Sequence, residues 1–131
     1  MIQQPSQFSY FISEKDLSSQ NGILLVIALM GPISRSNAPI FEKFLDELSQ
    51  KQAHWVIINL RDVEKDVERP MFPVFARLQK LIRDKPAELK LCGVHPELRV
   101  VLEQAGILRA TEVVNNLAMA LQTLSPRSNR G

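Results

Sequence analysis

Trp55-Val56-Ile57-Ile58-Asn59-Leu60 decides the fold class of this chain, because five of its six residues are apolar. Such a run, apolar without alternation, predicts a central strand that is covered on both faces of a sheet. A charged segment follows at residues 61–69, and Pro70 then opens a predicted helix. The apolar residues of this helix recur at spacings of four, three and four, at Met71, Phe75, Leu78 and Ile82. That stripe is typical of a helix that lies on a sheet.

The residues before this strand predict a hairpin and a helix. Residues 8–13 and 23–30 have the apolar content of strands, and the turn Asn21-Gly22 favours a tight antiparallel hairpin with its first strand at the sheet edge. Pro39 suits the first turn of the helix that follows, with Ser36 or Asn37 as the N-cap. The expected buried face consists of Ile40, Phe41, Phe44, Leu45 and Leu48.

The last third of the chain predicts two further strands, each followed by a helix. Residues 88–94 alternate as a strand, and His95 caps a helix that ends at Gly106 in the left-handed conformation. Residues 111–114 form a short strand, and Asn115 or Asn116 caps the last helix. The residues expected to face inward are Leu98, Val101, Leu102 and Ala105 in the first helix and Leu117, Ala120, Leu121 and Leu124 in the second.

The expected order is therefore β-β-α-β-α-β-α-β-α, an α/β fold with a mixed, mostly parallel sheet and four helices. Strands that alternate with helices run parallel through right-handed crossovers. We expect one domain at residues 8–124, preceded by a short extension, 1–7, and followed by a disordered basic tail, 125–131.

Composition argues against several classes of protein. The formal charge is only +2, and part of it lies in the tail at Arg127 and Arg130, while 6% of the residues are aromatic. A nucleic-acid face is therefore not expected. The amino terminus lacks the features of a signal peptide, and the longest apolar run, residues 23–30, is far shorter than the roughly 20 residues that span a bilayer. These features predict a soluble cytoplasmic protein without membrane insertion.

The sequence predicts no metal, cofactor or catalytic site. The single cysteine, Cys92, lies in an apolar strand and is expected to be a small buried hydrophobe. The two histidines, His54 and His95, have no ligand-type neighbours at metal-binding spacing. An acid–base pair of Asp62 with His95 is conceivable because both follow strands, but no nucleophile accompanies them. The glycines are scattered singly, so no phosphate-binding loop is expected.

Four segments in order resemble a STAS domain, the fold of bacterial anti-sigma-factor antagonists and of the cytoplasmic tails of sulfate-type transporters. They are Val26 to Gly31 followed by Pro32-Ile33, then residues 56–63, 91–96 and 102–108. The resemblance covers residues 8–124. It implies a regulatory protein of bacterial signal transduction and transcription regulation that binds a partner through the loops at residues 31–38 and 61–73.

The chain departs from this family at its phosphorylation motif. Phosphorylatable members carry Asp-Ser-Ser-Gly after the third strand, whereas the counterpart here is Val67-Glu68-Arg69-Pro70, or Asp66-Val67-Glu68-Arg69 after a shift of one residue. No Ser or Thr occurs from Arg61 to Pro86, so the usual phospho-switch cannot operate at this site. A carboxylate of Glu68 or Asp66 at the helix N-terminus would imitate the phosphorylated state, with Arg69 pairing with it or binding a partner. A loop that recognises a different partner and a solvated acidic first turn remain the alternatives.

We therefore predict a non-enzymatic interaction module of the anti-sigma-factor antagonist type. Its partner would be an anti-sigma or serine-kinase-like protein or another STAS protein, and the exposed first strand also permits a homodimer. Ser34 and Ser36 are alternatively helix-capping residues, and Phe72 is alternatively second-layer core. A small-ligand sensor with a pocket lined by Phe72 and Phe75 is the alternative function, and a hydrolase or transferase is the weakest hypothesis. The predicted partner-binding residues are Ser34, Arg35, Ser36, Asp62, Asp66, Glu68, Arg69, Met71 and Phe72.

Overall fold

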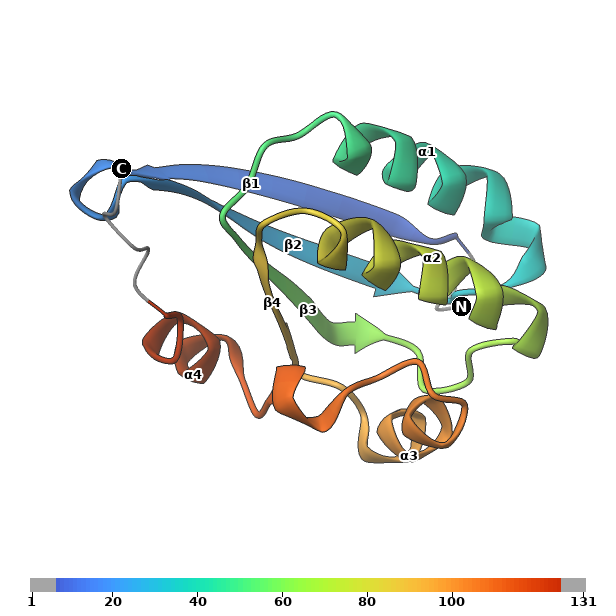
Figure 1. The fold of residues 1–131 in the computed structure, drawn as a ribbon. Helices are drawn as coiled ribbons and strands as arrows, with labels where there is room; N and C mark the ends of the chain where they lie inside the picture. Colours follow the sequence, from blue (N-terminus) through green and yellow to red (C-terminus); the bar gives the residue numbers. More distant parts are fainter. Residues whose placement is uncertain (1–6, 126–131) are drawn as a thin grey trace, which may run out of the picture.

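The computed structural model describes residues 7–125, which form a five-stranded sheet in the order β1-β2-β3-β4-β5 (Figure 1). β1 and β2 are antiparallel, and the other neighbouring strands are parallel, as predicted. The strands are β1 (Ser9–Leu17), β2 (Gly22–Gly31), β3 (Trp55–Val63), β4 (Glu88–Cys92) and β5 (Val113–Val114). The expected extension, 1–7, and tail, 125–131, lie outside the described residues except for Gln7 and Ser125.

Four α-helices and four 3₁₀ turns connect the strands in the predicted order. The helices are α1 (Ala38–Ser49), α2 (Phe72–Arg83), α3 (Pro96–Gln104) and α4 (Leu117–Gln122). The 3₁₀ turns are Ser18–Gln20, Arg35–Asn37, Arg69–Met71 and Ala110–Glu112. Figure 1 shows α1 and α2 side by side along the sheet, while α3 and α4 lie toward β4. Within residues 7–125, no helix has both the length and the apolar composition needed to cross a membrane.

β3 separates two hydrophobic clusters, which confirms that it is buried on both faces. Its Val56, Ile58 and Leu60 belong to the larger cluster, which also contains the buried residues of α1, α2 and α3. Trp55 and Ile57 point the other way and pack with Ala120 of α4. All five of these β3 side chains are at most 1% exposed. Because successive side chains in a strand alternate between faces, an apolar run of this length requires cover on both sides.

Local turn and cap signals were predicted correctly. Asn21 has a φ of 56° and leads from β1 into β2, whose nine-pair antiparallel register starts at Gly22. His95 accepts a hydrogen bond from the Glu97 N–H at the start of α3, and Asn116 accepts one from the Met119 N–H at the start of α4. Gly106 follows α3 with a φ of 75°. These signals act within a few residues, so the sequence alone determines them.

Several predicted boundaries were wrong. β1 continues to Leu17, beyond the predicted end at residue 13, β4 ends at Cys92 and not at residue 94, and β5 begins only at Val113 because residues 110–112 form a 3₁₀ turn. β3 continues to Val63, because Met30 and Gly31 of β2 still pair with Asp62 and Val63 after a bulge of one residue. α2 begins at Phe72 instead of Pro70, since residues 69–71 form a 3₁₀ turn. A helix that began at Pro70 would place Pro73 at its fourth position, where an N–H group is needed for the first helical hydrogen bonds.

Three residues predicted to face inward are exposed. Val101 is 43% exposed, Leu121 is 46% exposed, and Ala105 also faces solvent. α3 reaches the core only through Leu98 and Leu102, which lie one turn apart. The buried stripe of α3 is therefore narrower than the apolar residues of its sequence suggest.

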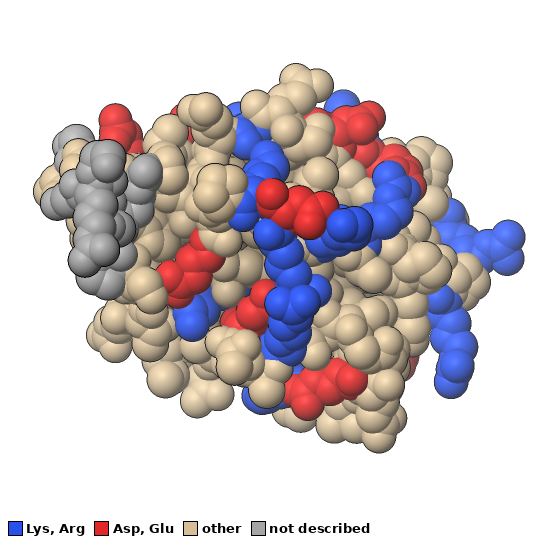
Figure 2. Space-filling view, viewed as in Figure 1, with Lys and Arg blue, Asp and Glu red and all other residues tan. Residues whose placement is uncertain are grey.

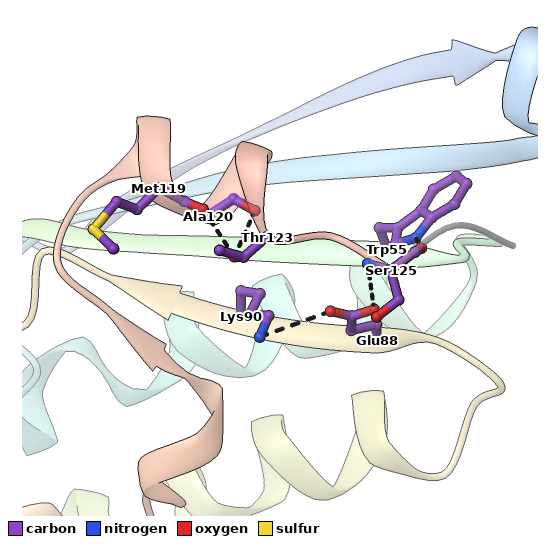
Figure 3. Close-up of polar contacts among 7 residues, drawn as sticks. All are labelled: Trp55, Glu88, Lys90, Met119, Ala120, Thr123 and Ser125. Carbon is purple, nitrogen blue, oxygen red and sulfur yellow. Dashed lines mark hydrogen bonds and ion pairs between the residues drawn. The ribbon is translucent and has the colours of Figure 1, made fainter.

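Hydrogen bonds between residues far apart in the sequence connect the ends of α1 and α4 to other parts of the fold. The Lys85 ammonium donates hydrogen bonds to the carbonyls of Leu48, Ser49 and Lys51, where α1 ends. Cations stabilise this end of a helix because its carbonyls carry partial negative charge. After α4, the Trp55 indole donates to the Ser125 carbonyl over 2.8 Å, and the Ser125 N–H donates to Glu88 (Figure 3).

Gln79 is the one polar residue of α2 that is buried within the core. It is 0% exposed, and neither atom of its amide has a hydrogen-bond partner within residues 7–125. A buried amide without partners costs free energy, because it has lost its hydrogen bonds to water.

Replacing Gln79 with Leu should therefore stabilise the fold. We expect Gln79→Leu to raise the free energy of unfolding by about 1–2 kcal/mol, measured by urea denaturation. Gln104→Leu is the matched control, since Gln104 is exposed on α3 and its replacement should change stability by less than about 0.5 kcal/mol. A loss of stability in Gln79→Leu would contradict this account and would indicate an internal water bound to the amide.

Candidate functional site

Two loops meet at the carboxyl ends of β2 and β3, and we call residues 32–37 and 64–71 the two-loop surface. The Glu64 N–H donates to the Gly31 carbonyl over 3.1 Å, and the Glu68 N–H donates to the Ile33 carbonyl over 3.2 Å. Gly31 has a φ of 87°, and a Cβ there would lie 2.7 Å from the Gln7 carbonyl oxygen, so this position requires glycine. Backbone hydrogen bonds therefore hold the loops against each other. Ligands and partners of α/β sheets commonly bind at this end.

The Glu68 carboxylate also joins the loops, but not in the way that the sequence suggested. Its oxygen accepts a hydrogen bond from the Arg35 N–H at 2.9 Å. Arg35 is the first residue of the 3₁₀ turn that leads into α1, so the carboxylate lies at the amino-terminal end of that helical run. No side-chain cap forms at the 3₁₀ turn of residues 69–71 or at the start of α2. The Glu68 side chain therefore caps the helical run of α1 and not that of α2, and its role as a substitute for a phosphate stays a prediction.

The predicted serines form a small polar network within the first loop. The hydroxyls of Ser34 and Ser36 are 3.0 Å apart, and the Asn37 side-chain amide donates to the Ser34 hydroxyl, also over 3.0 Å. The same amide donates to the Pro32 carbonyl. Asn37 occupies the N-cap position of α1, as one prediction held, but its side chain makes no cap hydrogen bond with the helix. The loop's polar side chains therefore stabilise the loop itself.

Most of the predicted charged residues are exposed on this surface. Arg35, Asp66 and Arg69 are exposed, and their side-chain charges make no ion pair or hydrogen bond within residues 7–125. Arg69 therefore does not pair with Glu68. Asp62 lies on β3 and forms an exposed ion pair with Arg61 at 3.5 Å. Figure 2 shows basic side chains projecting from the end of the molecule where α1 and α2 begin.

The predicted apolar contacts need correction. Met71 is 2% exposed and belongs to the main core, so it is not available to a partner in this conformation. Phe72 is partly buried and packs against the same core, which agrees with the second-layer alternative. Met71 is the last residue of the 3₁₀ turn that precedes α2, and its side chain faces the core, as the apolar stripe of the sequence predicts.

A groove that the sequence did not predict borders the two-loop surface. It has a volume of about 190 Å³ and lies between the second loop and α3. Its lining residues are Lys65, Asp66, Val67, Glu68, Leu98 and Val101. An ion pair of Lys65 with Glu97, 3.4 Å long, connects the same two segments. No local pattern indicates this groove, because its two walls are about 30 residues apart in the sequence.

Two other cavities are lined by none of the predicted site residues. One of about 540 Å³ lies between β1 and α1, and one of about 350 Å³ lies at the opposite end of the sheet, beside His54 and Lys85. Phe75, which the small-ligand alternative places in a pocket, is 0% exposed within the core. His95 caps α3 through its Nδ1 atom and makes no hydrogen bond with Asp62 within residues 7–125.

Comparison with known proteins agrees with this architecture. The family model of the STAS domain matches residues 14–120. The chain belongs to the STAS domain family. An anti-sigma F factor antagonist of Paenibacillus polymyxa is 22% identical over 102 residues, which cover 77% of this chain and 86% of that protein. The resemblance that the sequence suggested is thereby confirmed.

Solved structures of low sequence identity share the fold of this STAS domain. An anti-sigma factor antagonist from Mycobacterium paratuberculosis has a TM-score of 0.72 at 16% identity, covering 92% of this chain and 97% of that one. A sulfate transporter family protein from Wolinella succinogenes has a TM-score of 0.64 at 20% identity, covering 76% of this chain and 82% of that one. An anti-sigma factor antagonist and a sulfate transporter family protein thus share this fold, so the fold alone does not select a function.

The structure of this STAS domain predicts a local effect of removing the Glu68 carboxylate. In Glu68→Ala the Arg35 N–H loses its acceptor, so its hydrogen exchange, measured by NMR, should become faster. Overall stability should change by no more than about 1 kcal/mol, since the carboxylate is exposed. Asp66→Ala is the control, because Asp66 makes no hydrogen bond to Arg35. Unchanged exchange at Arg35 in Glu68→Ala would contradict the assigned hydrogen bond.

Cys92 should be unreactive in the native protein. Its side chain is 0% exposed, and burial raises the pKa of the thiol to about 11. The thiolate is the reactive form, and three pH units below the pKa only about one thiol in a thousand is ionised. At pH 8, labelling by a disulfide reagent should therefore be slow in native buffer and fast in concentrated urea. Rapid labelling of the folded protein would contradict the burial of this residue.

Proposed function

We propose that this STAS domain is a cytoplasmic, non-enzymatic regulator of the anti-sigma-factor antagonist type, which binds a partner protein through the two-loop surface. The observation that carries the proposal is a pair of loops joined by backbone hydrogen bonds, on which the side-chain charges of Arg35, Asp66 and Arg69 have no partner within residues 7–125. A surface that is already rigid loses little conformational entropy when it binds. Its exposed charges are suited to orienting a partner and accelerating the encounter.

The proposed partner is an anti-sigma factor, a serine-kinase-like protein or another STAS protein. The name of the Paenibacillus polymyxa relative, an anti-sigma F factor antagonist, supports the first of these. The mechanism is occupancy: the STAS domain binds the partner and thereby removes it from another complex. Such a mechanism needs affinity and correct concentrations but no chemical step.

We further propose that the two-loop surface works without the Ser phospho-switch of the family. The segment from Arg61 to Pro86 contains no Ser or Thr. Glu68 instead gives the loops a permanent negative charge, which is engaged by the Arg35 N–H. Phosphorylation regulates a site by adding charge reversibly, whereas this carboxylate is part of the encoded sequence. Control would then come from the amounts of the two proteins and from competing partners.

Binding to purified anti-sigma factors of the host tests this function. Each anti-sigma factor is titrated into the STAS domain by isothermal calorimetry, with wild type compared with Arg35→Ala and Arg69→Ala. We expect at least one factor to bind wild type, and each substitution to raise the Kd about tenfold through the loss of a charge-assisted contact. Arg77→Ala is the control, because Arg77 is exposed on α2 and pairs with Glu42 of α1.

Two results would contradict the proposal. If wild type binds none of the anti-sigma factors, the antagonist function is wrong. If an anti-sigma factor binds, but Arg77→Ala weakens that binding as much as Arg35→Ala and Arg69→Ala do, the contact surface lies along α1 and α2 instead. Thermal unfolding of each variant, followed by circular dichroism, separates a loss of contact from a loss of fold.

A further inference from the structure

The groove beside the two-loop surface has an apolar floor and a charged rim. Val67, Leu98 and Val101 supply apolar side chains, while Lys65, Asp66 and Glu68 supply the charges. Its volume of about 190 Å³ corresponds to about six water molecules in the liquid. That is room for one branched aliphatic side chain and is below the range of about 300–1,000 Å³ typical of small-molecule pockets.

Val101 is an apolar residue that the core of the fold does not bury. α3 packs on the core through Leu98 and Leu102, whereas Val101 is 43% exposed and lines the groove. A β-branched side chain is unfavourable in an exposed helical position, because its rotamers are restricted there. Val100 is 52% exposed on the same helix and is not a lining residue of the groove. The two valines therefore form a natural pair for comparison.

The rim of the groove has an excess of negative charge. The Lys65 ammonium forms an ion pair with the Glu97 carboxylate at 3.4 Å. The Glu68 carboxylate accepts a hydrogen bond from the Arg35 N–H. The carboxylate of Asp66, which lines the groove, has no cation or hydrogen-bond donor among residues 7–125. The same holds for Glu64, which does not line the groove but precedes Lys65 in the same loop. A basic side chain on the occupant would complement the Asp66 carboxylate.

We propose that this groove receives an aliphatic side chain of the partner protein, and that a Lys or Arg of the same partner segment binds the acidic rim. The inference rests on the proposed function, and it adds α3 as a second wall of the contact surface. A protein segment fits better than a free small molecule, because the groove is small and continuous with the two-loop surface. An apolar anchor in a pocket, surrounded by charges, is the usual arrangement of a binding hot spot.

Substitution of the two valines tests the groove. The anti-sigma factor that binds wild type is titrated against Val101→Glu and Val100→Glu, and the two variants carry the same chemical change at adjacent positions of α3. We expect Val101→Glu to raise the Kd at least about tenfold and Val100→Glu to raise it by less than about twofold. Both variants should unfold at similar temperatures, because both positions are exposed.

The outcomes separate the groove from the proposed function. Equal Kd values for the two valine variants would contradict the proposed role of the groove. Weaker binding by Arg35→Ala and Arg69→Ala would then still support the two-loop surface as the contact. Absence of binding to wild type would overturn the proposed function and the groove with it. If Val101→Glu alone loses its fold, Val101→Ser with Val100→Ser repeats the comparison without a new charge.

Cross-linking tests the chemistry of the occupant. A benzoylphenylalanine placed at position 101 is irradiated in the complex with the purified anti-sigma factor, and the linked peptide is identified by mass spectrometry. The expected peptide has Leu, Ile, Val or Met at the cross-link and a Lys or Arg within one helical turn. Raising the salt concentration should increase the Kd of the wild type for the anti-sigma factor by a larger factor than the Kd of Asp66→Asn. A linked peptide without a basic residue, or equal salt dependence of the two proteins, would overturn the charge assignment.

Discussion

Burial of β3 on both faces is the constraint on which the rest of the molecule depends. Val56, Ile58 and Leu60 need the cover of α1 and α2, while Trp55 and Ile57 need the cover of α4. The strand then continues past the bulge after Asn59 to Val63, which pairs with Gly31 of β2. The loop that follows therefore starts from a fixed point beside the end of β2 (Figure 1). Both loops of the candidate site are positioned by packing that takes place in the core.

The site itself depends on hydrogen bonds more than on apolar contacts. Two backbone bonds and the Glu68 carboxylate connect the loops, so that Arg35 and Arg69 project from a single surface. A phosphorylated serine would make such a surface switchable, since its charge appears and disappears. A carboxylate supplies the charge permanently. The groove beside α3 offers apolar side chains next to the loops, whose own Met71 is buried.

The correct predictions share one property, which is that their causes are local. The hairpin at Asn21-Gly22, the caps at His95 and Asn116 and the helix end at Gly106 each depend on a few neighbouring residues. The incorrect predictions concern burial, which depends on residues that are far away in the sequence. Val101 and Ala105 have the spacing of buried residues, but a helix at the end of a sheet has few neighbours to bury them. The sequence pattern also gave no indication that Gln79 of α2 is buried.

The sequence by itself determined the order of the elements, the family and the absence of Ser and Thr from Arg61 to Pro86. Periodicity and turn residues carry this information, since they express the geometry of helices and strands directly. Only the tertiary structure decided which groups meet. Glu68 contacts an N–H group 33 residues earlier in the chain, and Val101 shares a groove with Val67. Such contacts arise when the sheet brings separate loops to one end, and the local sequence does not encode their partners.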